Sequence, residues 1–392
     1  MKPITFFNIA IILVLTSCSP ATTALPTLLP TVIPTNTAIA FATPTQIPFD
    51  QVPFEYVSFS EPEKLWSENA GGISLEDHYL YVKDLASQTL FAYDLLTDPQ
   101  LTTPIFRIDY NTPLFFFDVH KDIIYAGFQT SFQSYSIADP SNLVSLQKYS
   151  YEISLSYQQI LATEDFVYVN DRRGKLDIRT TDGKLISRFN FSHPDYDAIL
   201  SPVHYSNGYL YVVVSRTTIT EPHQMEQSFR IYKRDDFNNL SLVSSFALPN
   251  LDFNVAPIIK YTINTRDNYV FLTWWVSQFA FIQEFTDKIL GEVIVLDIGN
   301  PNHIKVVTRG QASEAAYDAI LVDNYLFVLT ELGIRTHNFQ EIYYPYESTR
   351  KDLYQIEYKG RASQGNIVNF NNTIYVSTSE YELYRIEYTI QK

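Results

Sequence analysis

The 392-residue sequence has little of several residue types that whole classes of protein need. Its single cysteine excludes an internal disulfide, a cluster of thiolate metal ligands and a dithiol redox pair. Lys and Arg number 28 against 43 Asp and Glu, so the formal charge is −15. This balance argues against nucleic-acid binding, because phosphate contact needs clustered basic side chains. With only 12 Gly the chain is not collagen-like, whereas 29 Tyr and 27 Phe favour strands.

The N-terminal residues have the pattern of a targeting segment. Lys2 is followed by a largely apolar run from Ile4 to Leu15, which is too short to span a bilayer as a helix but suits a signal peptide. The run ends in Leu15-Thr16-Ser17-Cys18, which resembles the bacterial lipobox. The resemblance implies that residues 1–18 are a lipoprotein signal peptide and that Cys18 receives the lipid. The alternative is an ordinary secretory peptide with an unrelated cysteine.

Residues 19–52 are expected to form a disordered Thr/Pro-rich linker. Positions 19–49 hold eight Thr, six Pro and no charged residue. Proline fixes φ and lacks a donor, so such a chain favours an extended polyproline-like form that reaches on the order of 90 Å. The linker therefore predicts a tether that holds a folded domain, residues 53–392, away from a membrane.

A motif recurs seven times in that domain. Each copy has a turn pair with Asp or Asn, a few apolar residues and an aromatic residue, usually followed by valine. The aromatic positions are Tyr81, Tyr125, Tyr168, Tyr211, Phe271, Phe327 and Tyr375. Asx residues accept the positive φ of a tight hairpin turn, and the β-branched and aromatic run after it predicts a buried strand. Each copy is therefore expected to contain a β-hairpin.

The spacing of the copies predicts an all-β fold, a seven-bladed β-propeller. Four short antiparallel strands repeated every 40 to 50 residues are typical of propeller blades. The last copy, between Gly365 and Lys392, has room for only two or three strands. Because an unclosed ring would leave an open sheet edge, residues 54–59 are expected to supply the outer strand of the last blade.

Two blades carry a further motif after the third strand, in Ser134–Asn142 and Gly291–Pro301. Both segments resemble the repeat of the LVIVD family of bacterial and archaeal surface propellers, in which an apolar strand ends in Asp and an Asn/Asp-Pro turn. Asp94 with Asp98-Pro99 is a weaker match. The resemblance implies the propeller fold and a cell-envelope location, and it carries no general activity.

Two enlarged loops are candidate binding segments, because long loops are often functional. They lie between the second and third strands of adjacent blades, in the intervals Tyr211 to Tyr232 and Phe271 to Val295. The first contains Glu221 and His223, and the second contains Trp274, Trp275 and Phe279. The second loop is expected to form an exposed aromatic shelf that binds a protein, peptide or glycan. Trp275 is expected to be the more exposed of its two tryptophans. The alternative is that the two inserts pack on each other as a satellite core.

Acidic residues recur where one blade passes to the next. They are Asp109, Asp195, Asp197, Asp252 and Asp318. A ring of carboxylates at the channel mouth could hold Ca²⁺ or a cationic ligand, because hard cations take oxygen donors. The alternative is a set of Asx turns. No EF-hand loop, His-x-His pair, Gly-x-Ser-x-Gly elbow or Gly-rich phosphate loop occurs in the sequence.

Together these features predict a non-catalytic, lipid-anchored extracytoplasmic propeller of a bacterial envelope, which needs no cofactor and binds an envelope protein or a glycan. The rival hypothesis is an extracytoplasmic glycan hydrolase or lyase with carboxylates at the propeller mouth, since acidic pairs are plentiful. Fold alone does not decide between them.

Replacing Cys18 with Ser tests the anchor. Without the acceptor thiol, the protein should leave the membrane fraction or accumulate as an uncleaved precursor, which fractionation and the mass of the N-terminal peptide would show. Normal processing and membrane retention of Cys18→Ser would contradict the lipoprotein interpretation.

Overall fold

The computed structural model describes residues 56–66, 69–128, 131–139, 143–150, 157–171, 174–219, 225–235, 239–248, 259–276, 291–312, 316–323, 325–330, 333–338, 365–378 and 382–391. All of them belong to one compact unit, Phe49–Lys392. The predicted signal peptide, Cys18 and the linker lie outside the described residues. Within these ranges the regular elements are strands, and no helix is long and apolar enough to cross a membrane.

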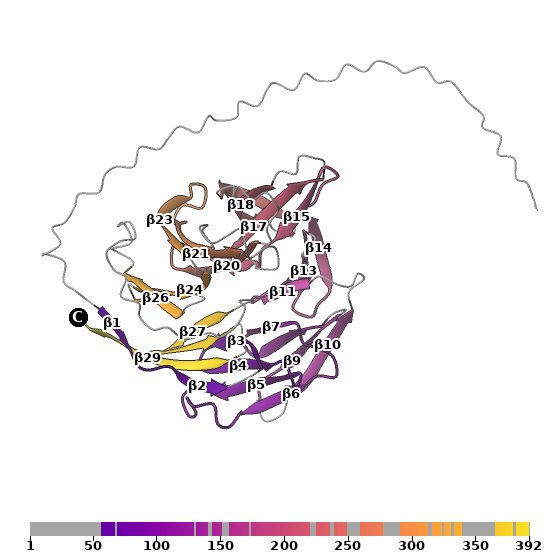
Figure 1. Ribbon diagram of the computed structural model, residues 1–392. Coiled ribbons are helices and arrows are strands. Elements are labelled where there is room, and N and C mark those ends of the chain that lie inside the picture. Colours follow the sequence, from indigo (N-terminus) through magenta and orange to yellow (C-terminus); the bar gives the residue numbers. More distant parts are fainter. Residues whose placement is uncertain are drawn as a thin grey trace, which may run out of the picture. The chain divides into compact units, whose positions relative to one another are not determined.

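The described strands form seven sheets that follow one another around a ring, which is a seven-bladed β-propeller (Figure 1). Blade 1 contains β3 (Ala70–Glu76), β4 (Tyr79–Asp84), β5 (Thr89–Asp94) and β6 (Phe106–Asp109). Blade 2 contains β7 (Phe116–His120), β8 (Ile123–Gly127), β9 (Ser131–Ser136) and β10 (Val144–Ser150). Blade 3 contains β11 (Tyr157–Ala162), β12 (Phe166–Asp171), β13 (Lys175–Thr180) and β14 (Leu185–Asn190).

The second half of the ring is less regular. Blade 4 contains β15 (Tyr196–Leu200), β16 (His204–Ser206), β17 (Tyr209–Thr218), β18 (Met225–Arg234) and β19 (Leu240–Ala247). Blade 5 contains β20 (Ile259–Arg266), β21 (Tyr269–Val276), β22 (Gly291–Asp297) and β23 (Lys305–Ala312). Blade 6 contains β24 (Ala316–Val322), β25 (Tyr325–Thr330) and β26 (Gly333–Asn338). Blade 7 contains β27 (Asn366–Phe370), β28 (Thr373–Ser377) and β29 (Leu383–Gln391), with β1 (Tyr56–Phe59) and β2 (Glu63–Trp66) along its outer edge.

The repeated turns have the predicted backbone geometry. In five blades the first residue of the turn has a φ between 51° and 55°, and these residues are Asp77, Asn207, Asp267, Asp323 and Asn371. In blade 2 Lys121 takes this position, with a φ of 51°. Asn and Asp tolerate the left-handed region better than other non-glycine residues, which explains why they recur here. The hairpin prediction is therefore confirmed.

The Asp that ends the LVIVD-like strands also has the predicted role. Asp94 accepts a hydrogen bond from the backbone N–H of Leu96 at 2.9 Å, and Asp297 accepts one from Gly299 at 2.9 Å. Both are Asx turns, in which a carboxylate replaces a backbone acceptor as the chain reverses.

The hydrophobic core is divided among the junctions between blades. The described residues form seven buried clusters, and each contains the repeat aromatic of one blade packed against the next blade. These seven side chains, from Tyr81 to Tyr375, are each at most 1% exposed. An aromatic side chain buries a large apolar area, so one such residue on the second strand of every blade covers much of the adjoining sheet.

Polar side chains of the inner strands reinforce the same junctions and also point toward the next blade. The Asp118 carboxylate accepts the backbone N–H of Ala162 at 2.7 Å. Gln159 forms a bidentate contact with the backbone of Val203, at 2.6 and 3.0 Å. Further contacts of this kind join Glu76 to Lys121 N, Asn264 to Ala319 O and Asp318 to Ile367 N. Buried backbone groups at the channel wall are thereby satisfied across the junctions.

The predicted closure of the ring is confirmed, and it is longer than predicted. β1 pairs antiparallel with β29 at Phe59↔Tyr388, and β2 continues the pairing at Glu63↔Arg385. At the break between them, Ser60 N donates to Glu387 O at 2.8 Å. We call residues 56–66 the latch.

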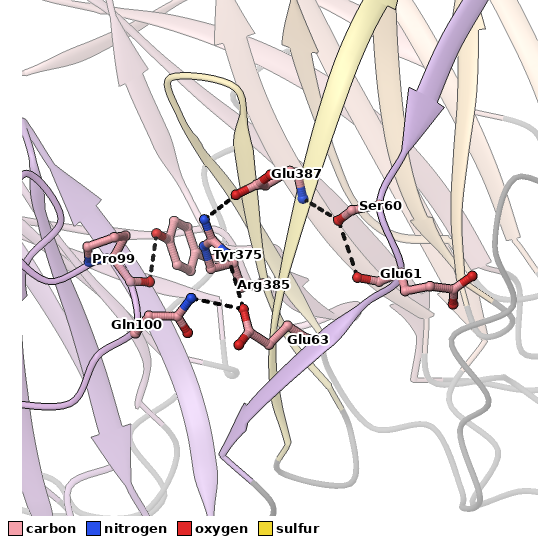
Figure 2. A network of polar contacts seen from close by, with 8 residues as sticks. All are labelled: Ser60, Glu61, Glu63, Pro99, Gln100, Tyr375, Arg385 and Glu387. Atoms are coloured by element: carbon pink, nitrogen blue, oxygen red, sulfur yellow. Dashed lines mark hydrogen bonds and ion pairs between the residues drawn. The ribbon is translucent and has the colours of Figure 1, made fainter.

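A polar network joins the latch to both sides of the seam (Figure 2). Arg385 of β29 donates to the Glu63 carboxylate at 3.1 Å, and Gln100 of blade 1 donates to the same carboxylate at 3.1 Å. The Tyr375 hydroxyl donates to Pro99 O at 3.2 Å. One segment of chain thus connects the last blade to the first.

Phe59→Ala should weaken the closed ring. The Phe59 side chain is 8% exposed and packs edge-on against Phe327 at 5.8 Å, so its loss should lower the free energy of unfolding by about 3 kcal/mol. Ser58→Ala is the matched control, since Ser58 lies in the same strand with an exposed hydroxyl, and should change stability by less than about 0.5 kcal/mol. Urea denaturation of both variants measures this; equal effects would contradict the role of the latch.

The two buried carboxyls should make stability depend on pH. Burial raises the pKa of Asp118 and of Asp318 to about 7, against an ordinary value of 3.8. Between these values the folded state keeps a proton that the unfolded state has lost, so this stabilisation is present at low pH and is lost as the pH rises through 7. From pH 5 to pH 7 the wild type should lose about 2 kcal/mol more than Asp318→Asn.

The control for this experiment is Ser58→Ala, which removes no titratable group, so its free energy of unfolding should follow the wild-type pH dependence. Identical pH dependence of the wild type and Asp318→Asn would show that Asp318 does not hold a proton in the folded state near neutral pH.

Candidate functional site

The second and third strands of blade 4 are longer than those of blade 1, at the end where the chain passes from one to the other. β17 and β18 are 10 residues long, whereas β4 and β5 of blade 1 have 6 residues each. The enlarged interval predicted here is therefore largely strand rather than loop. Glu221 and His223 lie between the two strands, outside the described residues.

The inner strand of blade 4 pairs with the additional residues of β17. β15 pairs with the far end of β17, with Asp197 opposite Thr217 and Tyr196 opposite Thr218. Ile219 N donates to Asp195 O at 3.1 Å. The structure thus brings Asp195 and Asp197 beside the first enlarged loop, two features that the sequence suggested separately. We call residues 193–200, 214–219 and 225–228 the blade-4 extension.

One face of the blade-4 extension carries two exposed isoleucines among polar residues. Side chains alternate along a strand, so Asp197 and Ile199 share a face with Thr217 and Ile219 of the paired strand. Ile199 is 48% exposed and Ile219 is 50% exposed. Continued toward the ring, the same face of β17 carries Tyr211 and Val213, which are buried against blade 5. Ile199 therefore lies directly beyond the core of this junction, and Ile219 lies further along, past Asp197 and Thr217.

The other face carries an aromatic and charged group. The Arg216 guanidinium lies 4.5 Å from the centre of the Tyr196 ring, and the His193 ring stacks on Tyr196 with centroids 5.4 Å apart. His193 also lies 3.1 Å from the Asp195 carboxylate. A guanidinium over a tyrosine face is held by the ring quadrupole, so this group fixes the tip of the blade-4 extension.

The prediction of an exposed tryptophan shelf is wrong. Trp274 and Trp275 are each 4% exposed, because β21 stays in the sheet as far as Val276 and both its faces are covered by neighbouring blades. Trp274 packs in the cluster shared with blade 4, and its indole N–H donates to Glu292 at 3.0 Å. Trp275 faces blade 6 and meets Tyr317 edge-on at 5.4 Å. Phe279 lies outside the described residues.

The predicted ring of acidic residues does not include Asp109 or Asp318. Asp109 lies on the outer strand β6, where it accepts from Thr89 at 2.8 Å. Asp318 is buried in the junction with blade 7, and its carboxylate also accepts from Asn264 at 2.7 Å. Asp252 lies outside the described residues. Among the residues described, no group of three or more His, Cys, Asp or Glu is placed to hold a metal ion.

Two other buried titratable groups are engaged in contacts between blades. Burial lowers the pKa of Lys83 to about 8, and its ammonium donates to Phe115 O of the next blade at 2.9 Å. Burial lowers the pKa of His204 to about 4, and its Nε2 lies 2.8 Å from the Thr265 hydroxyl. Lys83 and His204 each contact the following blade, so both serve the junctions between blades.

Little in the sequence indicated the exposure of Ile199 and Ile219 or the contact between Tyr196 and Arg216. The available signal was the long interval after Tyr211, which indicated an insertion. The β-branched residues Val214, Thr217, Thr218 and Ile219 could have shown that the insertion continues the strand.

Comparisons with known proteins bear on the fold. No protein-family model matches the sequence, and no curated protein matches it. A chain of a Saccharomyces cerevisiae complex of Dbp5 bound to Nup159, Gle1, IP6 and ADP is 10% identical, with coverage of 85% of this chain and 95% of that chain and a TM-score of 0.50. Sqt1 of Saccharomyces cerevisiae is 8% identical, covering 80% and 82%, with a TM-score of 0.50.

BamB from Moraxella catarrhalis is 11% identical, with coverage of 81% of this chain and 84% of that chain and a TM-score of 0.46. At such identities a structural likeness concerns the fold alone. The chain is a seven-bladed β-propeller, as the LVIVD-like motifs imply.

Proposed function

We propose that the chain is a lipid-anchored extracytoplasmic propeller that binds a protein partner through the blade-4 extension. The anchor and the tether rest on Cys18 and the Thr/Pro-rich residues 19–52 of the sequence. The binding role rests on one observation: two exposed isoleucines, Ile199 and Ile219, share one face of strands that extend beyond those of blade 1. Strands that project from a rigid scaffold can hold such a pair in fixed geometry.

The surroundings of this pair indicate the chemistry of the partner. Asp195 and Asp197 are exposed on the same face, and Asp197 lies between the two isoleucines. Protein interfaces combine apolar contacts with polar ones. Because the polar residues of this face include two carboxylates and the whole chain has a formal charge of −15, a partner with basic side chains beside apolar ones is favoured.

The enzyme hypothesis needs carboxylates that are free at the mouth of the channel. In the part of the chain that the structure describes, Asp118 and Asp318 instead hold backbone amides of the next blade. Asp109 lies on an outer strand. These placements favour binding over hydrolysis.

Site-specific photo-crosslinking in intact cells tests the proposal. A photoreactive residue at position 199 or 219 of the full chain should give a discrete adduct of the same mass with one partner. Leu185 and Leu242, exposed by 40% and 52% on the outer strands β14 and β19, are the matched control positions and should not give it.

A second arm separates binding from proximity. Ile199→Asp with Ile219→Asp should abolish the adduct formed from a photoreactive residue at position 217, while thermal stability changes little, since both side chains are exposed. Equal adducts from the control positions, or an adduct that survives the double substitution, would contradict a binding role for the blade-4 extension.

A further inference from the structure

A second exposed apolar segment lies on the same face of the ring as the blade-4 extension. Residues 110–115 connect β6 of blade 1 to β7 of blade 2, and we call them the 110–115 loop. Because the strands of a blade alternate in direction, this connection lies on the face where second strands pass to third strands. Phe115 is 52% exposed there, although the preceding Leu114 is buried, and Pro113 is exposed beside it. Single exposed apolar residues are common, but the neighbours that hold this one are not.

One of these neighbours is a buried lysine. Lys83 of β4 is 7% exposed, and its ammonium donates to the Phe115 carbonyl at 2.9 Å. In the part of the chain that the structure describes, no carboxylate lies within ion-pair distance of this ammonium. Removing an ammonium from water is costly, and an apolar side chain of similar volume would fill the same space without that cost. The contribution of the ammonium is therefore the position of the Phe115 backbone.

Another neighbour is a strained glutamine. Gln88, in the turn between β4 and β5, has a φ of 56°, in the left-handed region that residues other than Gly, Asn and Asp rarely adopt. Its backbone carbonyl accepts the Tyr110 N–H at 3.0 Å, and its side-chain carbonyl accepts the Leu114 N–H at 3.2 Å. Strain of this kind persists where the surrounding structure determines it, and it clusters at functional sites. Here Gln88 fixes both ends of the 110–115 loop.

Both backbone polar groups of Phe115 are hydrogen-bonded. Its N–H donates to Gly127 O at 2.9 Å, and its carbonyl accepts from Lys83. The following ring, Phe116, lies so close over Gly127 that any side chain at that position would clash with it. The backbone that carries the exposed Phe115 ring is thus fixed before a partner arrives. A preorganised aromatic residue loses little conformational entropy on binding, which is typical of the anchors that dominate protein interfaces.

We propose that Phe115 is a second anchor for the protein partner of the blade-4 extension, and that its ring enters an apolar pocket of that partner. This inference rests on the proposed function. Both segments lie on one face of the ring, in blades 2 and 4, so a single partner seated over the mouth of the channel contacts both. Lys83 is a positioning residue, because it acts on the partner through the backbone of Phe115.

Photo-crosslinking of the full chain in intact cells tests the second anchor. A photoreactive residue at position 115 should give an adduct with the same protein as one at position 199. Leu96 is the matched control position, because it is 64% exposed in a turn of blade 1 on the opposite face, and it should not give this adduct. A different protein or a lipid captured from position 115 would overturn the proposal.

Two substitutions test the roles of the side chains. Phe115→Ala should lower the yield of the adduct formed from a photoreactive residue at position 217 by about tenfold, as expected for the loss of an anchor residue. Lys83→Met should lower the same yield by a similar factor while the melting temperature does not fall, because methionine fills the space of the lysine stem and carries no buried charge. Leu96→Ala is the control and should leave the yield unchanged.

The outcomes separate this inference from the proposed function. Adducts from positions 199 and 219 with none from 115, or an unchanged yield in Phe115→Ala, would overturn the second anchor and leave the binding role of the blade-4 extension standing. An unchanged yield in Lys83→Met would overturn the positioning role of Lys83. The absence of an adduct from all three positions would contradict both proposals.

Discussion

The burial of one aromatic side chain between each pair of neighbouring blades is the interaction on which the rest of this structure depends. A blade of four short strands has two faces and cannot cover either alone. The repeat aromatic of its second strand, such as Tyr211, is fully buried against the next blade. Because all seven contacts run in the same direction around the chain, the last blade must meet the first. The latch makes this possible by adding β1 and β2 to blade 7 before the chain enters blade 1.

The polar groups near the channel also connect neighbouring blades. Asp118, Gln159 and Asp318 lie on inner strands, where their side chains bind the backbone of the following blade. In isolation an acidic residue near a channel mouth suggests a ligand site. Here the carboxylates of Asp118 and Asp318 accept hydrogen bonds that join neighbouring blades. Surface available for function is found where the structure departs from the repeat, as at the blade-4 extension.

The sequence predicted the repeated part of the structure well and its irregular part poorly. Turn pairs such as Asn207-Gly208 and the spacing of the aromatic residues predicted the blades, because turn geometry and strand burial depend on short segments of the sequence. The short last copy predicted the latch. By contrast, the burial of Trp274 and Trp275 depends on how far β21 stays in its sheet and on two neighbouring blades.

Native-state hydrogen exchange of a Tyr211→Ala variant tests most directly whether the contacts between blades make the ring one cooperative unit. Tyr211 lies in the junction of blades 4 and 5, far along the chain from the latch. If the ring is cooperative, the opening free energies of protected amides in β4, β8 and β28 should fall by the same amount as those in β17. A loss confined to blades 4 and 5, with unchanged protection in the other second strands, would contradict this account.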